Sequence, residues 1–219
     1  MADIREHCCG ADELFDRKTA QKQYRRYQRK GPARVTASLI NQLGQVPVDG
    51  RHLMDIGGGI GALQWWFLDT GGERSTAVDA SSGYLAQAEE HARSRGWEDR
   101  SRFHFGDFVD MAEELDQADL VTMDKVVCCY PNFHDILRHA CRKSEDILAI
   151  SYPMDGVISR GMAGLGALFS SLRGSAFRPY VHPVRAIRGL LAEEGFERQS
   201  HRLRFPWHTE LYRRTLAAE

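Results

Sequence analysis

The hydrophobic positions along the chain follow two alternating patterns. Short apolar runs alternate with longer stretches in which apolar residues recur every three or four positions. The short runs predict buried strands and the longer spacing predicts amphipathic helices. The predicted strands cover 51–56, 75–79, 102–106, 118–123, 146–152, 196–205 and about 210–215. The predicted helices cover 11–30, 33–43, 61–69, 82–95, 134–142 and 183–194.

This alternation predicts an α/β fold, with a mostly parallel sheet covered by helices on both faces. Residues 1–48 show no strand pattern, so we expect them to form an N-terminal helical lid over a domain of residues 49–219. The Gly- and Ser-rich stretch 157–174 is open to two interpretations. It is either a helix over the site or a helix packed on the sheet.

Composition narrows the class of protein. The 219 residues are 42% hydrophobic and 27% charged, as in a globular protein, and the net charge of -1 favours neither nucleic acid nor membrane surfaces as partners. No apolar run approaches the roughly 18 residues that span a bilayer. The charged N-terminus lacks a signal-peptide pattern, so we expect a cytoplasmic protein whose five cysteines are thiols. The sequence does not indicate an oligomeric state.

The glycine-rich stretch 53–63 is the most informative motif. A strand that ends in a glycine cluster and leads into a helix is typical of a nucleotide site, because glycines allow a tight turn and close backbone approach. The spacing of Gly57, Gly59 and Ala62 also fits the dinucleotide fingerprint. However, Asp55 lies two residues before the first glycine, where a carboxylate suits a positively charged ligand better than a pyrophosphate. The motif therefore favours S-adenosylmethionine (SAM).

Two further acids follow predicted strands. Asp79 comes 20 residues after Gly59, where a carboxylate accepts hydrogen bonds from ribose hydroxyls, although a helix N-cap explains it equally. Asp107 and Phe108 follow the third strand and would accept the adenine amino proton and stack on the base. A turn aspartate beside a core phenylalanine is the alternative.

As a set, these residues resemble the class I SAM-dependent methyltransferases. The motifs that carry the resemblance are Asp55, Gly57, Gly59, Gly61, Asp79, Asp107, the run 119–121 and residues 195–196. The resemblance implies a Rossmann-like three-layer sandwich with a seven-stranded sheet whose last strand is antiparallel. It also implies SAM at the carboxyl ends of strands one to four.

In that arrangement Asp55 and the glycines surround the methionyl part, Asp79 holds the ribose, and Asp107 with Phe108 holds the adenine. Asp124, at the end of the fourth strand, is placed with the cofactor residues. Residues 15–16, 25–27, 30–32 and 126–131 look like a subgroup of bacterial small-molecule methyltransferases of unassigned substrate. Some of these are labelled magnesium-protoporphyrin methyltransferase-like, but no haem-sized pocket can be recognised in this sequence.

The methyl acceptor is expected beside the end of the fourth strand. Tyr130 would orient the acceptor or cover the sulfonium, and His134 has the side chain of a general base. The alternatives are a loop tyrosine and a surface histidine.

Two other groups also have two interpretations. The pairs 8–9 and 128–129 are cysteines that could approach one another and bind zinc or a metalloid, but adjacent cysteines lack ordinary zinc spacing, so no metal ligand is assigned. The basic and aromatic cluster 24–30 is either a lid that reaches an anionic group or a solvated face.

The sequence thus predicts a SAM-dependent methyltransferase acting on an O, N or S atom of a small molecule. One rival is an NAD(P)-dependent oxidoreductase, for which we find no Tyr-x-x-x-Lys pair. The other is a non-catalytic SAM-binding partner subunit with a blocked acceptor cavity.

Overall fold

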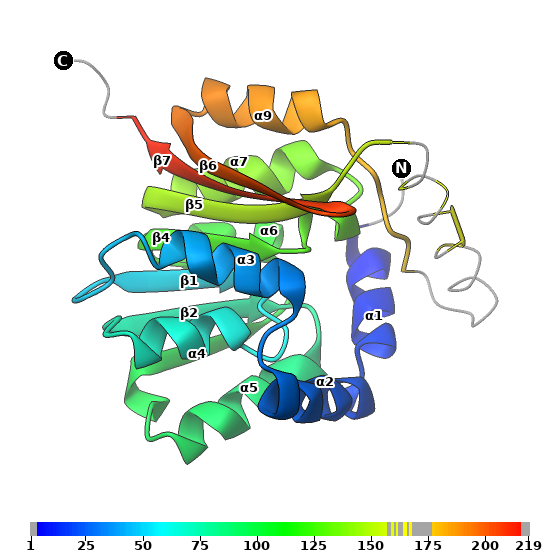
Figure 1. Cartoon of the computed structure of the whole chain (residues 1–219). Coiled ribbons are helices and arrows are strands. Elements are labelled where there is room, and N and C mark those ends of the chain that lie inside the picture. Colours follow the sequence, from blue (N-terminus) through cyan, green and yellow to red (C-terminus); the bar gives the residue numbers. More distant parts are fainter. Residues whose placement is uncertain are drawn as a thin grey trace.

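A computed structural model of the chain describes residues 4–156, 159, 161, 164, 165, 167 and 177–215. Most of the stretch 157–174, for which the sequence left two interpretations open, lies outside the described residues. The described residues form a central sheet with helices on both faces (Figure 1).

The sheet has seven strands in the order β3-β2-β1-β4-β5-β7-β6. Strands β1 to β5 are mutually parallel, and β7 runs antiparallel to both β5 and β6. The predicted seven-stranded sheet with an antiparallel last strand is therefore confirmed. The strands are β1 (His52–Ile56), β2 (Arg74–Asp79), β3 (Ser101–Phe105), β4 (Ala118–Asp124), β5 (Ser144–Pro153), β6 (Phe196–Arg204) and β7 (Trp207–Arg214).

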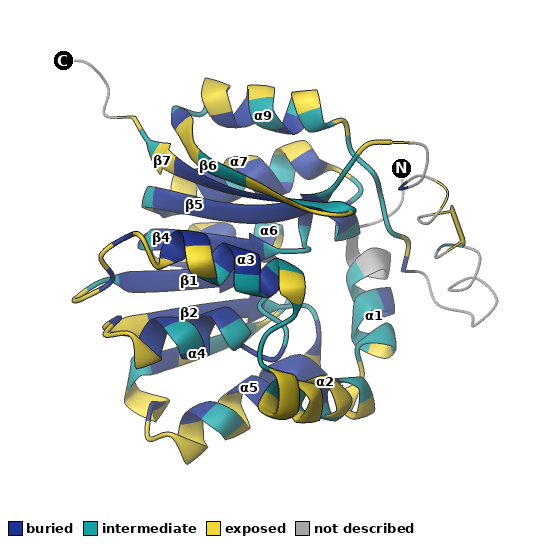
Figure 2. Ribbon diagram, viewed as in Figure 1, coloured by how far each residue is buried: buried dark blue, intermediate teal, exposed yellow. Residues whose placement is uncertain are grey.

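Strands β1, β2, β4 and β5 are mostly buried (Figure 2), as the short apolar runs predict. Successive side chains of a strand point to opposite faces, so Leu53 belongs to one core and Met54 to the other. One core includes residues of α3 (Arg34–Leu43), α4 (Ala62–Asp69) and α5 (Ser82–Ser94). The other includes residues of α6 (Phe108–Met111), α7 (Phe133–Lys143) and α9 (Val184–Glu193).

The N-terminal segment divides into three helices with different positions. The predicted helix 11–30 is in fact two helices, α1 (Ile4–Leu14) and α2 (Arg17–Lys30), because the Asp16 carboxylate accepts the Thr19 N–H at 2.8 Å and begins a new helix. Helix α1 crosses the edge of the sheet where the parallel strands end (Figure 1). Helix α3 packs on the sheet with Leu39 and Leu43 fully buried, so this part of 1–48 contributes to the domain core. We call residues 4–30, which comprise α1, α2 and the turn between them, the cap.

The cap is docked on the start of α5. The Asp12 carboxylate accepts the Ser82 N–H at 2.7 Å, and the Ser81 hydroxyl donates to the Phe15 carbonyl at 2.7 Å. Gly83 makes this approach possible, because a Cβ added there would lie 2.6 Å from the backbone nitrogen of Arg17. The neighbouring atom belongs to the backbone, so it cannot rotate away.

We therefore expect Gly83→Ala to displace the cap and to lower the free energy of unfolding by roughly 1–3 kcal/mol, the usual cost of overpacking. The matched control is Gly189→Ala in α9, where an added Cβ meets nothing within 4 Å. That change should stabilise the protein by up to about 1 kcal/mol through helix propensity. Urea denaturation measures the free energy of unfolding of both variants. An equal gain in stability in both would contradict the docking of the cap at Gly83.

Candidate functional site: a cavity at the carboxyl edge of the sheet

A cavity of about 410 Å³ lies where the parallel strands β1 to β4 end. The strand order reverses between β1 and β4, and ligands of open α/β sheets bind outside the carboxyl ends of the strands at this position. Its walls combine residues that follow β1, β2, β3 and β4 with residues of the cap and the start of α3. The predicted residues in the lining are Gly57, Gly59, Asp79, Asp107, Phe108, Asp124 and Tyr130.

The glycine turn after β1 is shaped by close contacts on both sides. Gly57 has a φ of +63°, and a Cβ there would lie 2.4 Å from Val126 Cγ2. Gly58 covers the carboxylate of Asp55, since a Cβ at Gly58 would lie 2.5 Å from Asp55 Oδ2. Gly61 lies outside the lining; it precedes α4 at φ +91° and packs against Trp65 and Ala88. Gly58 is a lining residue that the sequence pattern did not single out, and any side chain there would meet the Asp55 carboxylate.

Asp55 does not line the cavity. Its side chain is fully buried behind the turn, where Oδ1 accepts the Thr122 hydroxyl at 2.6 Å and Oδ2 has no hydrogen-bond partner among the described residues. Burial raises the pKa of Asp55 to about 7, against the Thr122 hydrogen bond, which lowers it. The backbone of the turn therefore separates this carboxylate from the cavity.

The raised pKa makes stability depend on pH. An unfolded aspartate has a pKa of about 3.9, so between about pH 4 and pH 7 the folded state holds a proton that the unfolded state has lost. The contribution of Asp55 to the free energy of unfolding therefore falls as pH rises through this window. We expect Asp55→Asn to be more stable than the wild type by roughly 1–3 kcal/mol at pH 8, and nearly equal to it at pH 5. Urea denaturation at both pH values measures this difference.

The exposed Asp99→Asn serves as the control, and its stability difference from the wild type should be the same at both pH values. If Asp55→Asn also gave a difference independent of pH, the buried carboxylate would not be the cause.

Asp79 faces the cavity from the end of β2. Its Oδ2 accepts the Gly59 N–H and its Oδ1 accepts the Ser81 N–H, both at 2.8 Å. Burial raises the pKa of Asp79 to about 6, although both backbone hydrogen bonds lower it. A carboxylate offers about four lone-pair positions, so two remain for hydroxyl donors of a ligand. The helix-cap alternative, raised for this residue from the sequence, corresponds to Ser81, which is the N-cap of α5.

Asp107 lies after β3 and holds a small hydrogen-bonded cluster. Its Oδ1 accepts the Val109 N–H at 2.9 Å as the N-cap of α6, and it also accepts the Tyr130 hydroxyl. Its Oδ2 accepts the Cys8 thiol at 3.4 Å, which connects the cap to the domain. Phe108 is buried beside it and lines the same cavity.

The two residues predicted to act on the acceptor have different positions. Tyr130 lines the cavity, but its hydroxyl donates to Asp107, and burial raises the pKa of Tyr130 above its ordinary value. The tyrosine therefore stays protonated and is a donor. His134 is exposed in the first turn of α7 and is not among the lining residues, because the inward face of that helix carries Phe133 and Ile136.

The thiols around the site have oxygen partners. Cys8 lies against Asp107, while the Sγ atoms of Cys128 and Cys129 are 3.9 Å apart and both donate to the Lys125 carbonyl, at 3.4 and 3.3 Å. The hydrogen bond with the Cys128 thiol, together with burial, raises the pKa of Cys129 well above its ordinary value. A metal binds the thiolate, so binding here would have to displace these protons. The side chain of Cys9 lies outside the described residues.

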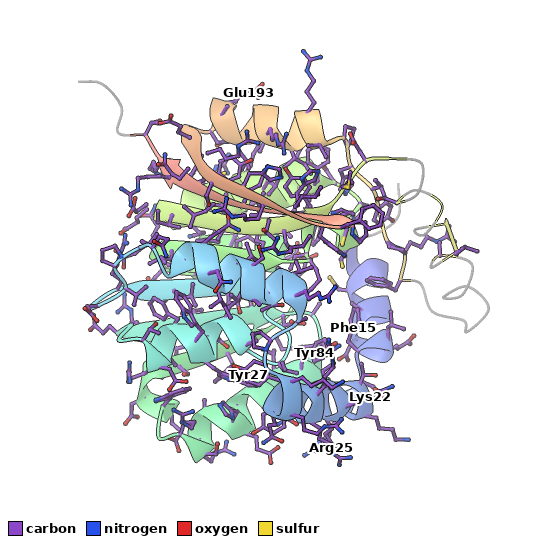
Figure 3. All side chains as sticks on the ribbon, in the orientation of Figure 1. Phe15, Lys22, Arg25, Tyr27, Tyr84 and Glu193 are labelled. Atoms are coloured by element: carbon purple, nitrogen blue, oxygen red, sulfur yellow. The ribbon has the colours of Figure 1, made fainter. Side chains whose placement is uncertain are left out.

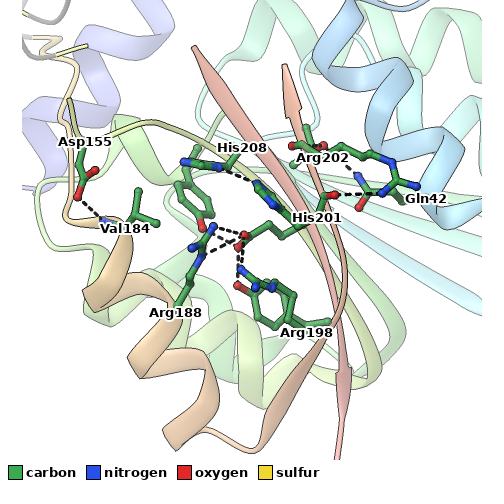
Figure 4. Close-up of polar contacts among 12 residues, drawn as sticks. Gln42, Asp155, Val184, Arg188, Arg198, His201, Arg202 and His208 are labelled. Atoms are coloured by element: carbon green, nitrogen blue, oxygen red, sulfur yellow. Dashed lines mark hydrogen bonds and ion pairs between the residues drawn. The ribbon is translucent and has the colours of Figure 1, made fainter. Parts of the chain in front are cut away.

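Away from the cavity, His201, His208 and Glu210 have ligand atoms within 4.8 Å of one another (Figure 4). The Glu210 carboxylate is fully buried and already accepts five donors, from Arg188 twice and from Arg198, Tyr152 and Tyr212 once each. Five donors exceed the four lone-pair positions of a carboxylate, so no position is left for a metal. We assign this cluster the structural role of joining α9, β6 and β7.

The cap supplies further residues to the cavity wall. Phe15 stacks on Tyr84 with ring centroids 5.4 Å apart, and Figure 3 shows the two side chains together at the junction of the cap and α5. Arg26 and Tyr27 of the basic cluster line the cavity, whereas Lys22 and Arg25 point outward in Figure 3. The cluster is thus partly a cavity wall and partly a solvated face.

In the part of the chain that the structure describes, none of the helices combines the length and apolar composition needed to cross a membrane.

Comparisons with known proteins agree with this geometry. A family model described as a methyltransferase domain matches residues 53–145, which include the glycine turn, Asp79 and Asp107. No curated protein matches the chain.

Several solved structures share the fold. Magnesium protoporphyrin IX methyltransferase from Synechocystis PCC 6803, with bound S-adenosylhomocysteine, has a TM-score of 0.70 and 18% identity over 94% of this chain and 98% of that one. An O-methyltransferase family protein from Burkholderia thailandensis has a TM-score of 0.66 and 15% identity over 84% of this chain and 57% of that one. A proposed RNA methyltransferase from Pyrococcus horikoshii has a TM-score of 0.62 and 14% identity over 87% of this chain and 86% of that one.

The chain therefore has the fold of the class I SAM-dependent methyltransferases, and the resemblance that the motifs indicated is confirmed. At these identities the likeness shows the fold alone. Two of these proteins are named for acceptors that differ in kind, magnesium protoporphyrin IX and RNA, so the fold does not determine the acceptor.

Proposed function

We propose that this protein is a SAM-dependent methyltransferase that transfers a methyl group to an O, N or S atom of a small molecule. The observation that carries the proposal is the row of carboxylates along the cavity: Asp79 and Asp124 end β2 and β4, and Asp107 lies just after β3. Carboxylates favour a ligand with positive charge and hydroxyl or amino donors, and SAM has a sulfonium, an ammonium and a ribose diol.

The order of the strands matches the parts of this cofactor. Asp107 and Phe108 at β3 would hold the adenine, Asp79 at β2 the ribose, and the glycine turn with Asp124 the methionyl part. From β3 to β4 there are three strand spacings, or roughly 14 Å, which suits an extended nucleoside with an amino-acid tail. Bound there, SAM supplies a methyl group on a sulfonium, which is reactive toward nucleophiles.

The protein itself has to position the methyl acceptor relative to the cofactor. The acceptor atom must lie about 3–3.5 Å from the methyl carbon and in line with the sulfur. The cap residues Cys8 and Phe15 close the cavity, and the protonated Tyr130 hydroxyl is held by Asp107. His134 is not positioned to act as a base on an acceptor in the cavity, because the cavity lining does not include it.

The oxidoreductase alternative fits this sheet less well. A classic dinucleotide fold has the strand order 3-2-1-4-5-6, whereas here the antiparallel β7 lies between β5 and β6. An RNA acceptor has little support from a chain with a net charge of -1, since nucleic-acid binding relies on excess basic charge.

The test is methyl transfer to acceptors of defined chemistry. The purified protein is incubated with SAM and panels of phenols, amines, thiols and carboxylic acids, and mass spectrometry measures S-adenosylhomocysteine and the methylated product. Formation of both with one class, above the rate without acceptor, supports the proposal. Tight cofactor binding with no turnover across the panels would instead favour the non-catalytic subunit.

A further inference from the structure

The end of β4 carries an ion pair that the strand pattern does not explain. Lys125 Nζ lies 2.6 Å from Asp124 Oδ2, and both residues line the cavity. Among the described residues, Lys125 is the one non-glycine residue with a positive φ, +64°. Left-handed backbone costs a lysine free energy, and such strain concentrates at functional sites.

The surrounding contacts hold this pair in place from three elements. The Thr36 hydroxyl of α3 donates to Asp124 Oδ2 at 2.5 Å and accepts from Lys125 Nζ at 3.2 Å. The Ser151 hydroxyl of β5 donates to Asp124 Oδ1 at 2.6 Å, and the Lys125 N–H donates to Ser151 Oγ at 2.8 Å. The strained backbone is thus fixed by hydrogen bonds on both sides.

Each charged group keeps bonding capacity toward the cavity. Asp124 has about four lone-pair positions and accepts three donors, from Thr36, Lys125 and Ser151. Lys125 has three N–H donors and uses two, toward Asp124 and Thr36. The side chains are 10% and 35% exposed, respectively, so one acceptor and one donor stay accessible to a ligand.

The position of Asp124 and Lys125 indicates which part of a bound ligand they would contact. Val126, the next residue, packs against Gly57 of the glycine turn, so the pair lies beside the first glycine. An α-amino acid carries an ammonium and a carboxylate on one carbon, and its complement is a carboxylate and an ammonium held side by side.

We infer that Asp124 and Lys125 together recognise the amino-acid end of the cofactor, with Lys125 Nζ on its carboxylate and Asp124 on its ammonium. This inference rests on the proposed function and adds Lys125 and Thr36 to the cofactor residues. It makes Lys125 a residue that distinguishes SAM from nucleosides without the amino-acid tail.

The test compares two nucleosides by calorimetry on the full chain. S-adenosylhomocysteine has the amino-acid end, and 5′-methylthioadenosine lacks it. For Lys125→Met we expect the affinity for S-adenosylhomocysteine to fall roughly 10–100-fold, as for a lost charge-assisted hydrogen bond, with the affinity for methylthioadenosine unchanged within about twofold. Lys125→Arg should restore part of the loss.

Two further variants keep the test independent of folding. Lys125→Gly removes the backbone strain, so it should fold at least as stably and still lose the preference for S-adenosylhomocysteine. The outward-pointing Lys22→Met should bind both nucleosides as the wild type does. An equal fall for both nucleosides in Lys125→Met, or no fall for either, would overturn the inference. Failure of the wild type to bind either nucleoside would instead overturn the proposed function.

Discussion

Gly57→Ala is expected to abolish most cofactor binding and to destabilise the fold. At φ +63° an alanine costs about 1–2 kcal/mol, and its Cβ would lie 2.4 Å from Val126 Cγ2, which adds an overpacking cost of about 1–3 kcal/mol. The free energy of unfolding should therefore fall by roughly 2–5 kcal/mol. Because the turn and the β4 loop must separate, we expect the Kd for S-adenosylhomocysteine to rise by about 100-fold, or roughly 3 kcal/mol.

Gly50→Ala separates the two causes. Gly50 has a φ of +68°, and an added Cβ meets nothing within 4 Å. It precedes β1, at the edge of the sheet opposite the cavity. This variant should lose about 1–2 kcal/mol of stability and no cofactor affinity. Calorimetry and urea denaturation of both variants measure the difference, and similar affinity in Gly57→Ala and the wild type would place the cofactor elsewhere.

Asp79→Ala is expected to weaken binding of S-adenosylhomocysteine by about 1–3 kcal/mol, because it removes charge-assisted acceptors for the ribose hydroxyls. Asp79→Asn should lose less, since the amide keeps one oxygen. The pKa of Asp79 is raised to about 6, so the wild-type affinity should also fall as pH drops from 7.5 to 5.5 and the carboxylate gains a proton. Calorimetry at both pH values tests these expectations.

The control is Asp69→Ala, which removes a carboxylate paired with Arg95 at the surface. Its affinity should equal that of the wild type. Unchanged affinity in Asp79→Ala would refute the assignment of the ribose to the end of β2.

The sheet could be predicted from the sequence because its signal is local. Short runs such as 52–56, in which Leu53, Met54 and Ile56 are apolar, are typical of buried strands, and the carboxyl ends of parallel strands share one edge of the sheet. That rule brings Asp79, Asp107 and Asp124 together without any structure. The break at Asp16 also had a local signal, an aspartate three residues before the Thr19 N–H that it caps.

The rest of the site depends on contacts between distant segments. Cys8 contacts Asp107, which lies 99 positions away in the sequence, and Thr36 contacts Asp124, which lies 88 positions away. The spacing of apolar residues along the chain does not predict such contacts. The position of Asp55 has another cause. The pleat of β1 directs its side chain behind Gly58, and this contact exists only once the glycine turn has folded. The outward position of His134 could have been predicted, since Phe133, Ile136 and Leu137 define the buried face of α7.

The most direct test of the central claim is the choice of cofactor. Calorimetric titration of the full chain with S-adenosylhomocysteine and, separately, with NADH measures it under one set of conditions. We predict saturable binding of S-adenosylhomocysteine at one site per chain, weakened about 100-fold in Gly57→Ala and unchanged in Gly50→Ala, and no binding of NADH. Binding of NADH without binding of S-adenosylhomocysteine would contradict the account.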